Sequence, residues 1–217
     1  MDKEVIRKNK ETPEFILIQP ADEYDVRGFD SEYSYIADRT DRSFLLCAVP
    51  VGSWFSDLSP WDAPPVFGKD PFGHGAPRTL GYITDSLIPE IKRVHGCAGA
   101  KAVLGGYSLA GLFSLWGGYN YEGFYGIAAA SPSVWFRGWD EYTDKNAFLP
   151  HRAYLSVGDK EEKTKNPVMA SVGRALTAQY EKLLSSGVDV TLEYNEGNHF
   201  KDADIRTAKA FLDIMKK

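Results

Sequence analysis

A short apolar run that ends in small residues around one serine constrains the fold of this chain more than any other feature. Residues 101–111 read KAVLGGYSLAG, and large apolar side chains then recur at helical spacing as far as Tyr119. The run predicts a strand, a tight turn and a helix, with Ser108 in the turn. Gly106 and Ala110 lie two residues before and after Ser108, where a bulky side chain would collide with the neighbouring backbone. A serine in this setting is typical of an exposed nucleophile.

Apolar runs rich in branched residues alternate with amphipathic segments along the rest of the chain. This alternation is typical of a parallel sheet covered by helices, and it predicts an α/β domain. The expected strands are 15–18, 44–49, 101–104, 126–129, 153–157 and 188–194. The last of them alternates in polarity, as a strand near a sheet edge does. Further helices are expected over 80–94, from Pro167 to about residue 183 with Asn166 as its cap, and over 202–215.

Length and charge limit the classes of function. The chain has 217 residues, 43% of them hydrophobic, so it can bury one full core, and residues 1–217 are predicted to form a single domain. The formal charge of −5 is spread along the chain without a basic cluster, so neither nucleic acid nor a membrane surface is an expected partner. The first ten residues are charged and no apolar run is long enough to cross a bilayer, which favours a cytoplasmic protein.

The chain carries no residue pattern that predicts a metal or a cofactor. Cys47 lies in an apolar strand and Cys97 in a loop of small residues, and their spacing fits neither a metal site nor a disulfide framework. Core packing is the favoured role for Cys47, ahead of nucleophilic catalysis. His199, Asp202 and Asp204 lack the spacing of a metalloprotease site.

The four histidines are the candidates for the general base that a serine hydroxyl needs. In a doubly wound sheet the reactive groups gather at the carboxyl ends of the strands. His199 follows the last expected strand and is the predicted base. His74, in a long loop rich in proline and glycine, is the alternative. His95 ends a helix and His151 precedes a strand, which places both at the opposite edge of the sheet.

Three carboxylates compete to orient the base. They follow the expected strand 153–157, whose carboxyl end faces the same edge as the base. Glu161 is favoured, because a turn opened by Gly158 commonly places the acceptor three residues on. Asp159 is the alternative, since its shorter side chain lies closer to the strand end, and Glu162 is third. Most of this charged run is expected to be solvated.

Acyl transfer also needs backbone N–H donors for the developing oxyanion. Leu109, directly after the predicted nucleophile, is one candidate, and Ser53 or Trp54, in the loop after strand 44–49, is the other. Aromatic side chains next to these segments are candidates for substrate contacts, with local packing as the competing interpretation. These aromatic candidates are Trp54, Trp61, Tyr107, Trp135 and Phe136.

Several of these segments together resemble the putative-esterase branch of the α/β-hydrolase fold. The branch includes enterochelin esterase-like, esterase D-like and feruloyl esterase-like enzymes. The resemblance implies a three-layer α/β-hydrolase fold with a mostly parallel central sheet, helices on both faces and minimal or no lid. It also implies hydrolysis of a carboxylic ester, with Ser108 as nucleophile, His199 as base and Glu161 or Asp159 as acid. The segments that carry it are 54–61, 105–113, 130–135, 155–161 and 197–199.

The sequence departs from the general hydrolase pattern at one position and leaves the acid open. Ala110 stands where the pattern has glycine, a small-for-small exchange that keeps the turn feasible. Some members of the branch use a serine–histidine pair alone, so a dyad is an alternative to a triad. A non-catalytic binding protein with this fold, a thioesterase and an acyltransferase are the alternative functions. Serine, carboxylates and histidine in this chain order favour an enzyme that acts on a small-molecule ester.

Overall fold

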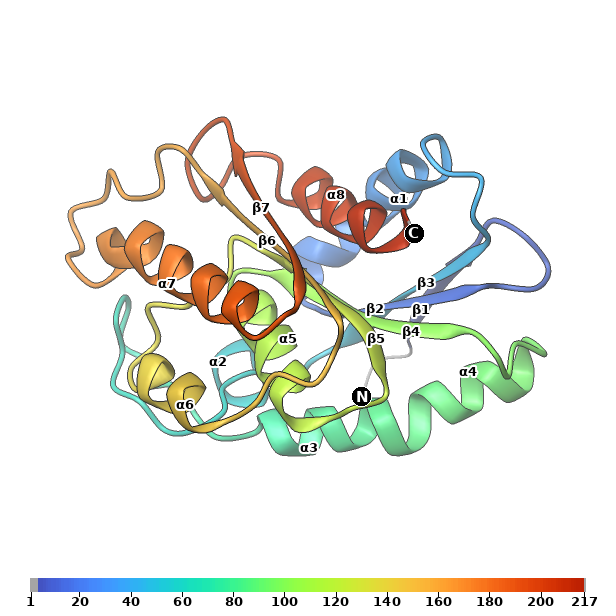
Figure 1. The fold of residues 1–217 in the computed structure, drawn as a ribbon, viewed down its shortest axis with the longest axis horizontal. Helices are drawn as coiled ribbons and strands as arrows, with labels where there is room; N and C mark the ends of the chain where they lie inside the picture. The colour runs from blue at the N-terminus through green and yellow to red at the C-terminus, as the bar shows by residue number, and fades with distance from the viewer. Residues whose placement is uncertain (1–3, 217) are drawn as a thin grey trace.

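A seven-stranded sheet forms the centre of the computed structural model, which describes residues 4–216. The strands lie in the order β1-β3-β2-β4-β5-β6-β7, and every neighbouring pair is parallel except β1 with β3 (Figure 1). This arrangement confirms the predicted mostly parallel α/β architecture. The strands are β1 Val5–Lys8, β2 Phe15–Ala21, β3 Phe44–Pro50, β4 Lys101–Tyr107, β5 Phe124–Ala130, β6 Arg152–Gly158 and β7 Asp189–Asn195.

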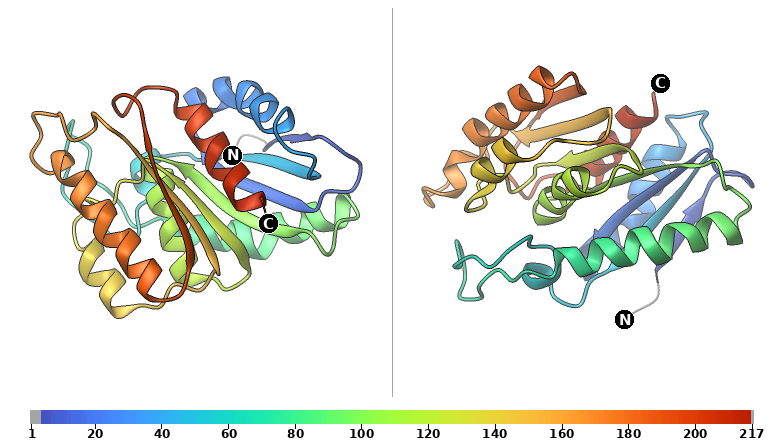
Figure 2. Two further views of the ribbon diagram at one scale, coloured as in Figure 1. Left: turned by 45° about the horizontal axis from the view of Figure 1, so that its top comes forward. Right: turned by 60° about the horizontal axis from the view of Figure 1, so that its bottom comes forward.

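Helices cover both faces of the sheet. One face packs against α1 (Glu23–Ala37) and α8 (Ala203–Met215), which lie side by side. The other face packs against the remaining long helical segments, and turned views keep the sheet between the two layers (Figure 2). These segments are α3 Ala76–Tyr82, η1 Ile83–Leu87, α4 Ile88–Val94, α5 Leu109–Asn120 and α7 Val172–Ser185. Short α2 (Trp54–Asp57), α6 (Trp139–Lys145) and η2 (Met169–Ser171) lie in the connections. The described residues include no separate lid domain.

The apolar character of each strand matches how deeply it is buried in the sheet. All seven residues of β2 are buried, as expected of a central strand that is covered on both faces. The edge strand β7 is mostly half-buried, which confirms the position that its alternating pattern predicted. In β4, a side chain at Gly105 would lie 2.6 Å from the ring of Phe211, so this glycine lets α8 approach the sheet closely. The approach matters because α8 carries a residue of the site described below.

Besides the short segments α2, α6 and η2, strand β1 and helix α1 were not predicted, because their signals are weak in sequence. Strand β1 has only four residues, two of them exposed. Helix α1 begins at a capping box, in which Asp22 and Asp25 each accept a hydrogen bond from the other's backbone N–H. Its buried stripe includes Glu32, a residue type that interrupts an apolar pattern.

The helix expected from Pro167 begins later than predicted. Asn166 does cap the segment, because its side chain accepts hydrogen bonds from the amides of Val168 and Met169. A short 3₁₀ turn follows, and the α-helix begins only at Val172. Val168 is therefore exposed rather than part of the inward face. The expected helix over 80–94 is the larger part of a continuous helical segment from Ala76 that contains one π-helical turn.

Among the residues that the structure describes, no helix combines the length and the apolar character that a membrane crossing requires. Both cysteines are buried and free. Burial raises the pKa of Cys47 to about 12, so its thiol stays protonated at neutral pH and is a poor nucleophile.

Candidate active site

The turn at Ser108 has the strained geometry that its small neighbours predicted. Ser108 adopts φ 57° and ψ −117° between the end of β4 and the start of α5, a backbone conformation that costs free energy for a residue other than glycine. A side chain at Gly106 would lie 2.6 Å from Cβ of Ala110. The two positions are thus close enough that both must be small. The turn is held by the Ser108 amide, which donates to the carbonyl oxygen of Ala130 on β5 at 3.1 Å.

His199 lies in the loop between β7 and α8 and contacts the serine directly. Its Nε2 is 2.9 Å from Oγ of Ser108, and its side chain is 21% exposed. The backbone of the loop is also held, because the hydroxyl of Tyr107 donates to the carbonyl oxygen of His199 at 2.8 Å. Burial raises the pKa of Tyr107 to about 12, so this hydroxyl keeps its proton. The imidazole is therefore fixed by its neighbours and still open to a small molecule.

Glu161 is the carboxylate that reaches the histidine. Its Oε2 is 2.7 Å from Nδ1 of His199, and its Oε1 accepts hydrogen bonds from the Ser131 hydroxyl and the Gly158 amide, both at 2.7 Å. The side chain is only 3% exposed. Burial acts to raise the pKa of Glu161, but the hydrogen bond and charge of His199, with these two further hydrogen bonds, hold it below its ordinary value.

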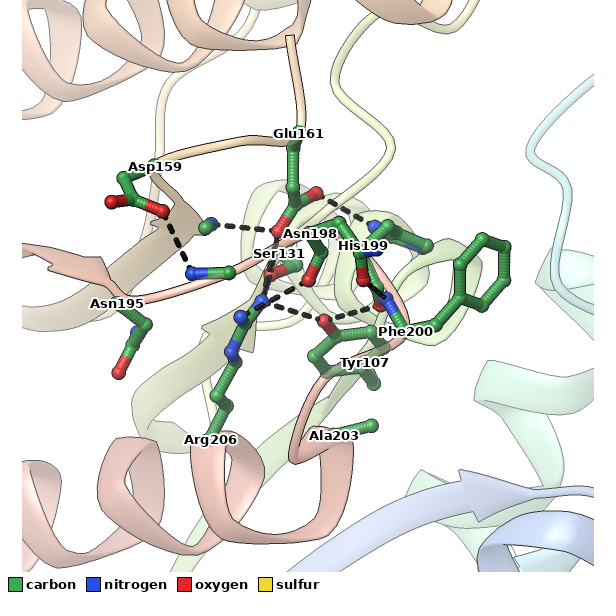
Figure 3. Close-up of polar contacts among 12 residues, drawn as sticks. Tyr107, Ser131, Asp159, Glu161, Asn195, Asn198, His199, Phe200, Ala203 and Arg206 are labelled. Atoms are coloured by element: carbon green, nitrogen blue, oxygen red, sulfur yellow. Dashed lines mark hydrogen bonds and ion pairs between the residues drawn. The ribbon is translucent and has the colours of Figure 1, made fainter. Parts of the chain in front are cut away.

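Asp159 and Glu162 do not contact the histidine. Oδ1 of Asp159 accepts a hydrogen bond from the amide of Gly197 at 2.7 Å, which ties the turn after β6 to the loop that carries His199 (Figure 3). Glu162 is exposed, and its carboxylate points toward Gly173 at the start of α7. Of the three carboxylates, only one completes a hydrogen-bonded chain with the serine and the histidine.

Arg206 was not singled out in the sequence, although the structure places it at the centre of the site. It extends from α8 with a side chain 2% exposed, and its Nη1 lies 3.0 Å from Oε1 of Glu161 and 3.0 Å from the hydroxyl of Tyr107 (Figure 3). Its Nη2 donates to the carbonyl oxygens of Glu196 and Asn198, both at 3.1 Å. One guanidinium thus holds the carboxylate and the loop of the base together.

A sequence signal for Arg206 exists. The residue occupies the same helical stripe as Ala210 and Ile214, at spacings of four residues, and both of these are fully buried. A charged residue within a buried stripe needs a partner of opposite charge, so it indicates a buried ion pair. The sequence does not tell which carboxylate that partner is.

The predicted oxyanion donors lie in different settings. Leu109 is the first residue of α5 and Trp54 the first of α2, so neither amide has an acceptor within its own helix. The amide of Ser53 instead donates to the carboxylate of Asp57 at 2.9 Å. The sheet order places β2 between β3 and β4, so the turn after β2 is a nearer neighbour of the serine strand than the loop with Ser53 and Trp54.

The predicted substrate-contacting aromatics pack mainly against one another. Trp61 donates its indole N–H to the carbonyl oxygen of Arg137 at 2.8 Å, and its ring centroid lies 5.8 Å from that of Phe136. Phe136 is buried and packs against Phe72, while Trp135 lies against the same phenylalanine. These contacts join two long loops, the one between β3 and α3 and the one between β5 and α6, into one aromatic cluster. His74, the alternative base, is exposed and pairs with Asp62 instead of a serine.

A family model described as "Putative esterase" matches residues 11–196 of the sequence. The chain belongs to this esterase family. It is accordingly a carboxylic ester hydrolase, which agrees with the resemblance found in its motifs. No curated protein matches the esterase in sequence.

Solved structures share the fold of this esterase across nearly its whole length. A siderophore hydrolase from Aspergillus nidulans has a TM-score of 0.76 at 16% identity, with 94% of this chain and 83% of that chain covered. An IroE-like serine hydrolase from Shewanella oneidensis has a TM-score of 0.80 at 17% identity, covering 97% and 74%. A Bacillus cereus carboxylesterase has 0.61 at 16% identity, covering 97% and 93%. At such low identity the likeness shows the fold alone.

Proposed function

We propose that this esterase cleaves a small-molecule carboxylic ester through an acyl-enzyme on Ser108. The supporting observation is the unbroken hydrogen-bond chain from Oγ of Ser108 through the imidazole of His199 to the carboxylate of Glu161. Both distances suit proton transfer and tautomer control, at 2.9 Å and 2.7 Å. The three groups come from distant parts of the chain and meet at the carboxyl edge of the sheet, where doubly wound folds hold their active sites.

In the first half of the reaction, Nε2 of His199 accepts the hydroxyl proton while Oγ of Ser108 attacks the ester carbonyl carbon. The tetrahedral intermediate then collapses, the bond to the alcohol oxygen breaks, and the imidazolium returns its proton to the departing alcohol. In the second half, a water molecule attacks the acyl-enzyme with the same base. The carboxylic acid leaves and the serine is restored.

Glu161 has two roles in this proposal. Its anionic Oε2 accepts a hydrogen bond from Nδ1–H of His199, which leaves Nε2 free to act as the base. It also stabilises the imidazolium that forms during each half of the reaction. Because Oε1 already accepts hydrogen bonds from other groups, the carboxylate stays ionised and cannot turn away from the imidazole. Asp159 has a structural role in this scheme, since it holds the loop of the base.

The oxyanion would be stabilised by backbone amides next to the serine. The amide of Leu109 at the start of α5 is the first donor in our proposal, supported by the positive end of a helix that begins there. A second donor comes from the loops beside it, either Trp54 as predicted or the turn that follows β2. The aromatic cluster is our proposed wall of the site for the acyl group. It includes Trp135 and Phe136, which directly follow the segment of Ser133, and the hydroxyl of Ser133 lies 3.4 Å from Oγ of Ser108.

We propose a small ester as the substrate class, because the imidazole of His199 is partly exposed and so accessible from solvent. The similar structures include siderophore hydrolases, so siderophore esters belong in a substrate panel beside simple alkyl and aryl esters. A thioester belongs in the same panel, because the same serine chemistry would cleave it.

The test is hydrolysis of a chromogenic short-chain ester by wild type and Ser108→Ala. Loss of the nucleophile should lower kcat by about 10⁴- to 10⁶-fold. Ser133→Ala is the matched control, because its hydroxyl lies 3.4 Å from Oγ of Ser108 but contacts no imidazole, and we expect turnover within tenfold of wild type. Equal turnover in wild type and Ser108→Ala, or no turnover of any ester in the panel by wild type, would contradict the proposal.

A further inference from the structure

Tyr107 also lines a cavity that includes none of Ser108, Glu161 and His199 in its lining. It has a volume of about 230 Å³ and lies between α1 and α8, at the carboxyl ends of β2 and β4. The two helices run side by side (Figure 1). Gly28 keeps α1 close to α8, since a side chain there would lie 3.3 Å from Cβ of Asp204. The proposed ester hydrolysis uses none of the polar groups that line this cavity except Tyr107.

The cavity is lined by acidic groups without a matching cation. Asp25, Glu32 and Asp204 all line it, whereas none of the described residues that do so is a lysine, an arginine or a histidine. Glu32 is only 2% exposed. Its Oε2 accepts a hydrogen bond from the side-chain amide of Gln19 at 2.7 Å, but its buried Oε1 has no partner among the described residues. A buried oxygen without a partner costs free energy that a donor in the cavity would recover.

Two of these carboxyl groups, Glu32 and Asp25, hold protons at a pH where exposed carboxyls do not. Burial raises the pKa of Glu32 to about 8, and the nearby charges of Asp25 and Asp204 add to the effect. Burial likewise raises the pKa of Asp25 to about 6. The titratable groups that line the cavity with Glu32 are Tyr24 and Asp25 on its own helix, Asp204 on α8 and the phenol of Tyr107 on β4. Strand β2 contributes only the uncharged amide of Gln19 as a polar side chain. A bound cation would favour the ionised forms of all three carboxyls.

We propose that this cavity binds the ammonium group of a small aliphatic primary amine. When Glu32 is ionised, its unpartnered Oε1 requires an N–H or O–H donor, and the three carboxyls favour a donor with positive charge. Pro20, Tyr24 and Ala203 add apolar surface for methylene groups. A metal ion suits the cavity less well, because no group of three or more His, Cys, Asp or Glu in the described part of the chain is arranged to hold one. At ~30 Å³ for a water-sized group, the volume of about 230 Å³ holds about seven heavy atoms, enough for a short aliphatic diamine.

Calorimetric titration with 1,4-diaminobutane at pH 8.0 and pH 5.5 tests the proposal. Butane-1,4-diol is the control, because it has the same length without charge. We expect the diamine to bind at pH 8.0 and the diol not to bind. At pH 5.5 the affinity for the diamine should fall at least tenfold, because the carboxyls must lose protons to pair with the ammonium group. Proton release should make the heat at pH 8.0 differ between phosphate and Tris buffers.

Substitutions locate the binding. Glu32→Gln keeps an acceptor for Gln19 and the size of the side chain but removes the charge, and it should lower the affinity for the diamine at least tenfold. Asp204→Asn should lower it by a smaller factor. Asp30→Asn is the matched control, since Asp30 lies on the same helix, is exposed and pairs with Arg7. Equal heats for diamine and diol, or an affinity that Glu32→Gln leaves unchanged, would overturn the proposal. The readout is binding, so it does not depend on ester hydrolysis.

Discussion

Glu161 and Glu32 are two buried carboxyl groups with opposite surroundings. Each is almost completely removed from solvent, with 7% and 2% of the residue surface exposed. Both oxygens of Glu161 have partners, including a histidine and an arginine, and its pKa is lowered. One oxygen of Glu32 has a single amide partner, the other has none, and burial raises its pKa to about 8. Burial disfavours a charge at both sites, and the partners decide whether the charge is kept.

Helix α8 contributes one residue to the surroundings of each carboxyl group. Arg206 and Asp204 are two positions apart on α8, yet the first lies at the serine site and the second at the cavity. A fully partnered carboxylate suits a residue that must stay charged and stationary through each turnover. A carboxyl with an unpartnered oxygen suits a group that changes its protonation state when a ligand binds. The predictions below test this comparison, beginning with the largest expected effect.

Exchanging the charge of Glu161 for an amide should break the serine site. Glu161→Gln should lower kcat/KM by about 10² to 10⁴-fold, because the amide cannot hold the imidazole in the tautomer that accepts the serine proton. Asp159→Asn is the matched control, since its remaining carbonyl oxygen can still accept the Gly197 amide, and we expect a change below tenfold. Steady-state kinetics on a chromogenic ester measure both. The reverse order of effects would assign the orienting role to Asp159.

Removing Arg206 should make the surroundings of Glu161 resemble those of Glu32. Arg206→Met should lower the free energy of unfolding by about 3–5 kcal/mol, because it leaves a buried carboxylate without its cation. It should also move the acid limb of the pH–activity profile of the folded enzyme to higher pH, since the Glu161–His199 pair then binds its proton more tightly. Denaturant titration and kcat/KM between pH 5 and 9 measure the two effects.

Arg206→Lys is the conservative variant for this test. It restores a positive charge but not the donors that reach the carbonyl oxygens of Glu196 and Asn198. It should therefore recover most of the shift in the pH profile and less of the stability. A profile for Arg206→Met that superimposes on that of wild type would limit Arg206 to a purely structural role.

Glu32→Gln should stabilise the protein, and the gain should grow with pH. The folded protein keeps the Glu32 proton up to about pH 8, whereas the unfolded chain loses it near the ordinary value of 4.5. The wild type thus loses stability as pH rises between these values. The glutamine variant avoids this loss, so its advantage should be about 1–3 kcal/mol larger at pH 8 than at pH 5. Denaturant titrations at both pH values measure it, and a pH-independent difference would count against a raised pKa of Glu32 in the folded protein.

The lowered pKa of Glu161 predicts the opposite dependence of folding stability on pH, with stability that falls as the pH is lowered. Its contribution to stability is complete above pH 4.5 and is lost as pH falls below that value toward the pKa in the folded state.

Local constraints made much of the site predictable. The turn at Ser108 needs small residues at fixed positions, and the turn opened by Gly158 brings Glu161 inward. Ser108 and Glu161 could therefore be singled out from the residues next to them in the sequence. Arg206 reaches its partner across 45 positions, which no local pattern encodes. The second oxyanion donor depends on which strand lies beside β4, and sequence order does not fix sheet order. Glu32 was missed because a carboxyl in an amphipathic helix is ordinarily solvated.

The wide spacing of these groups along the chain has a consequence for biosynthesis. The serine and the histidine are 91 positions apart, and the arginine follows the histidine on the next helix. A ribosome therefore completes most of the sheet before it makes the residue that holds the carboxylate and the loop of the base together. A nascent chain that ends before α8 should fold in part without hydrolysing esters. Enzymatic activity would then report the docking of one late helix, and not merely the presence of a folded sheet.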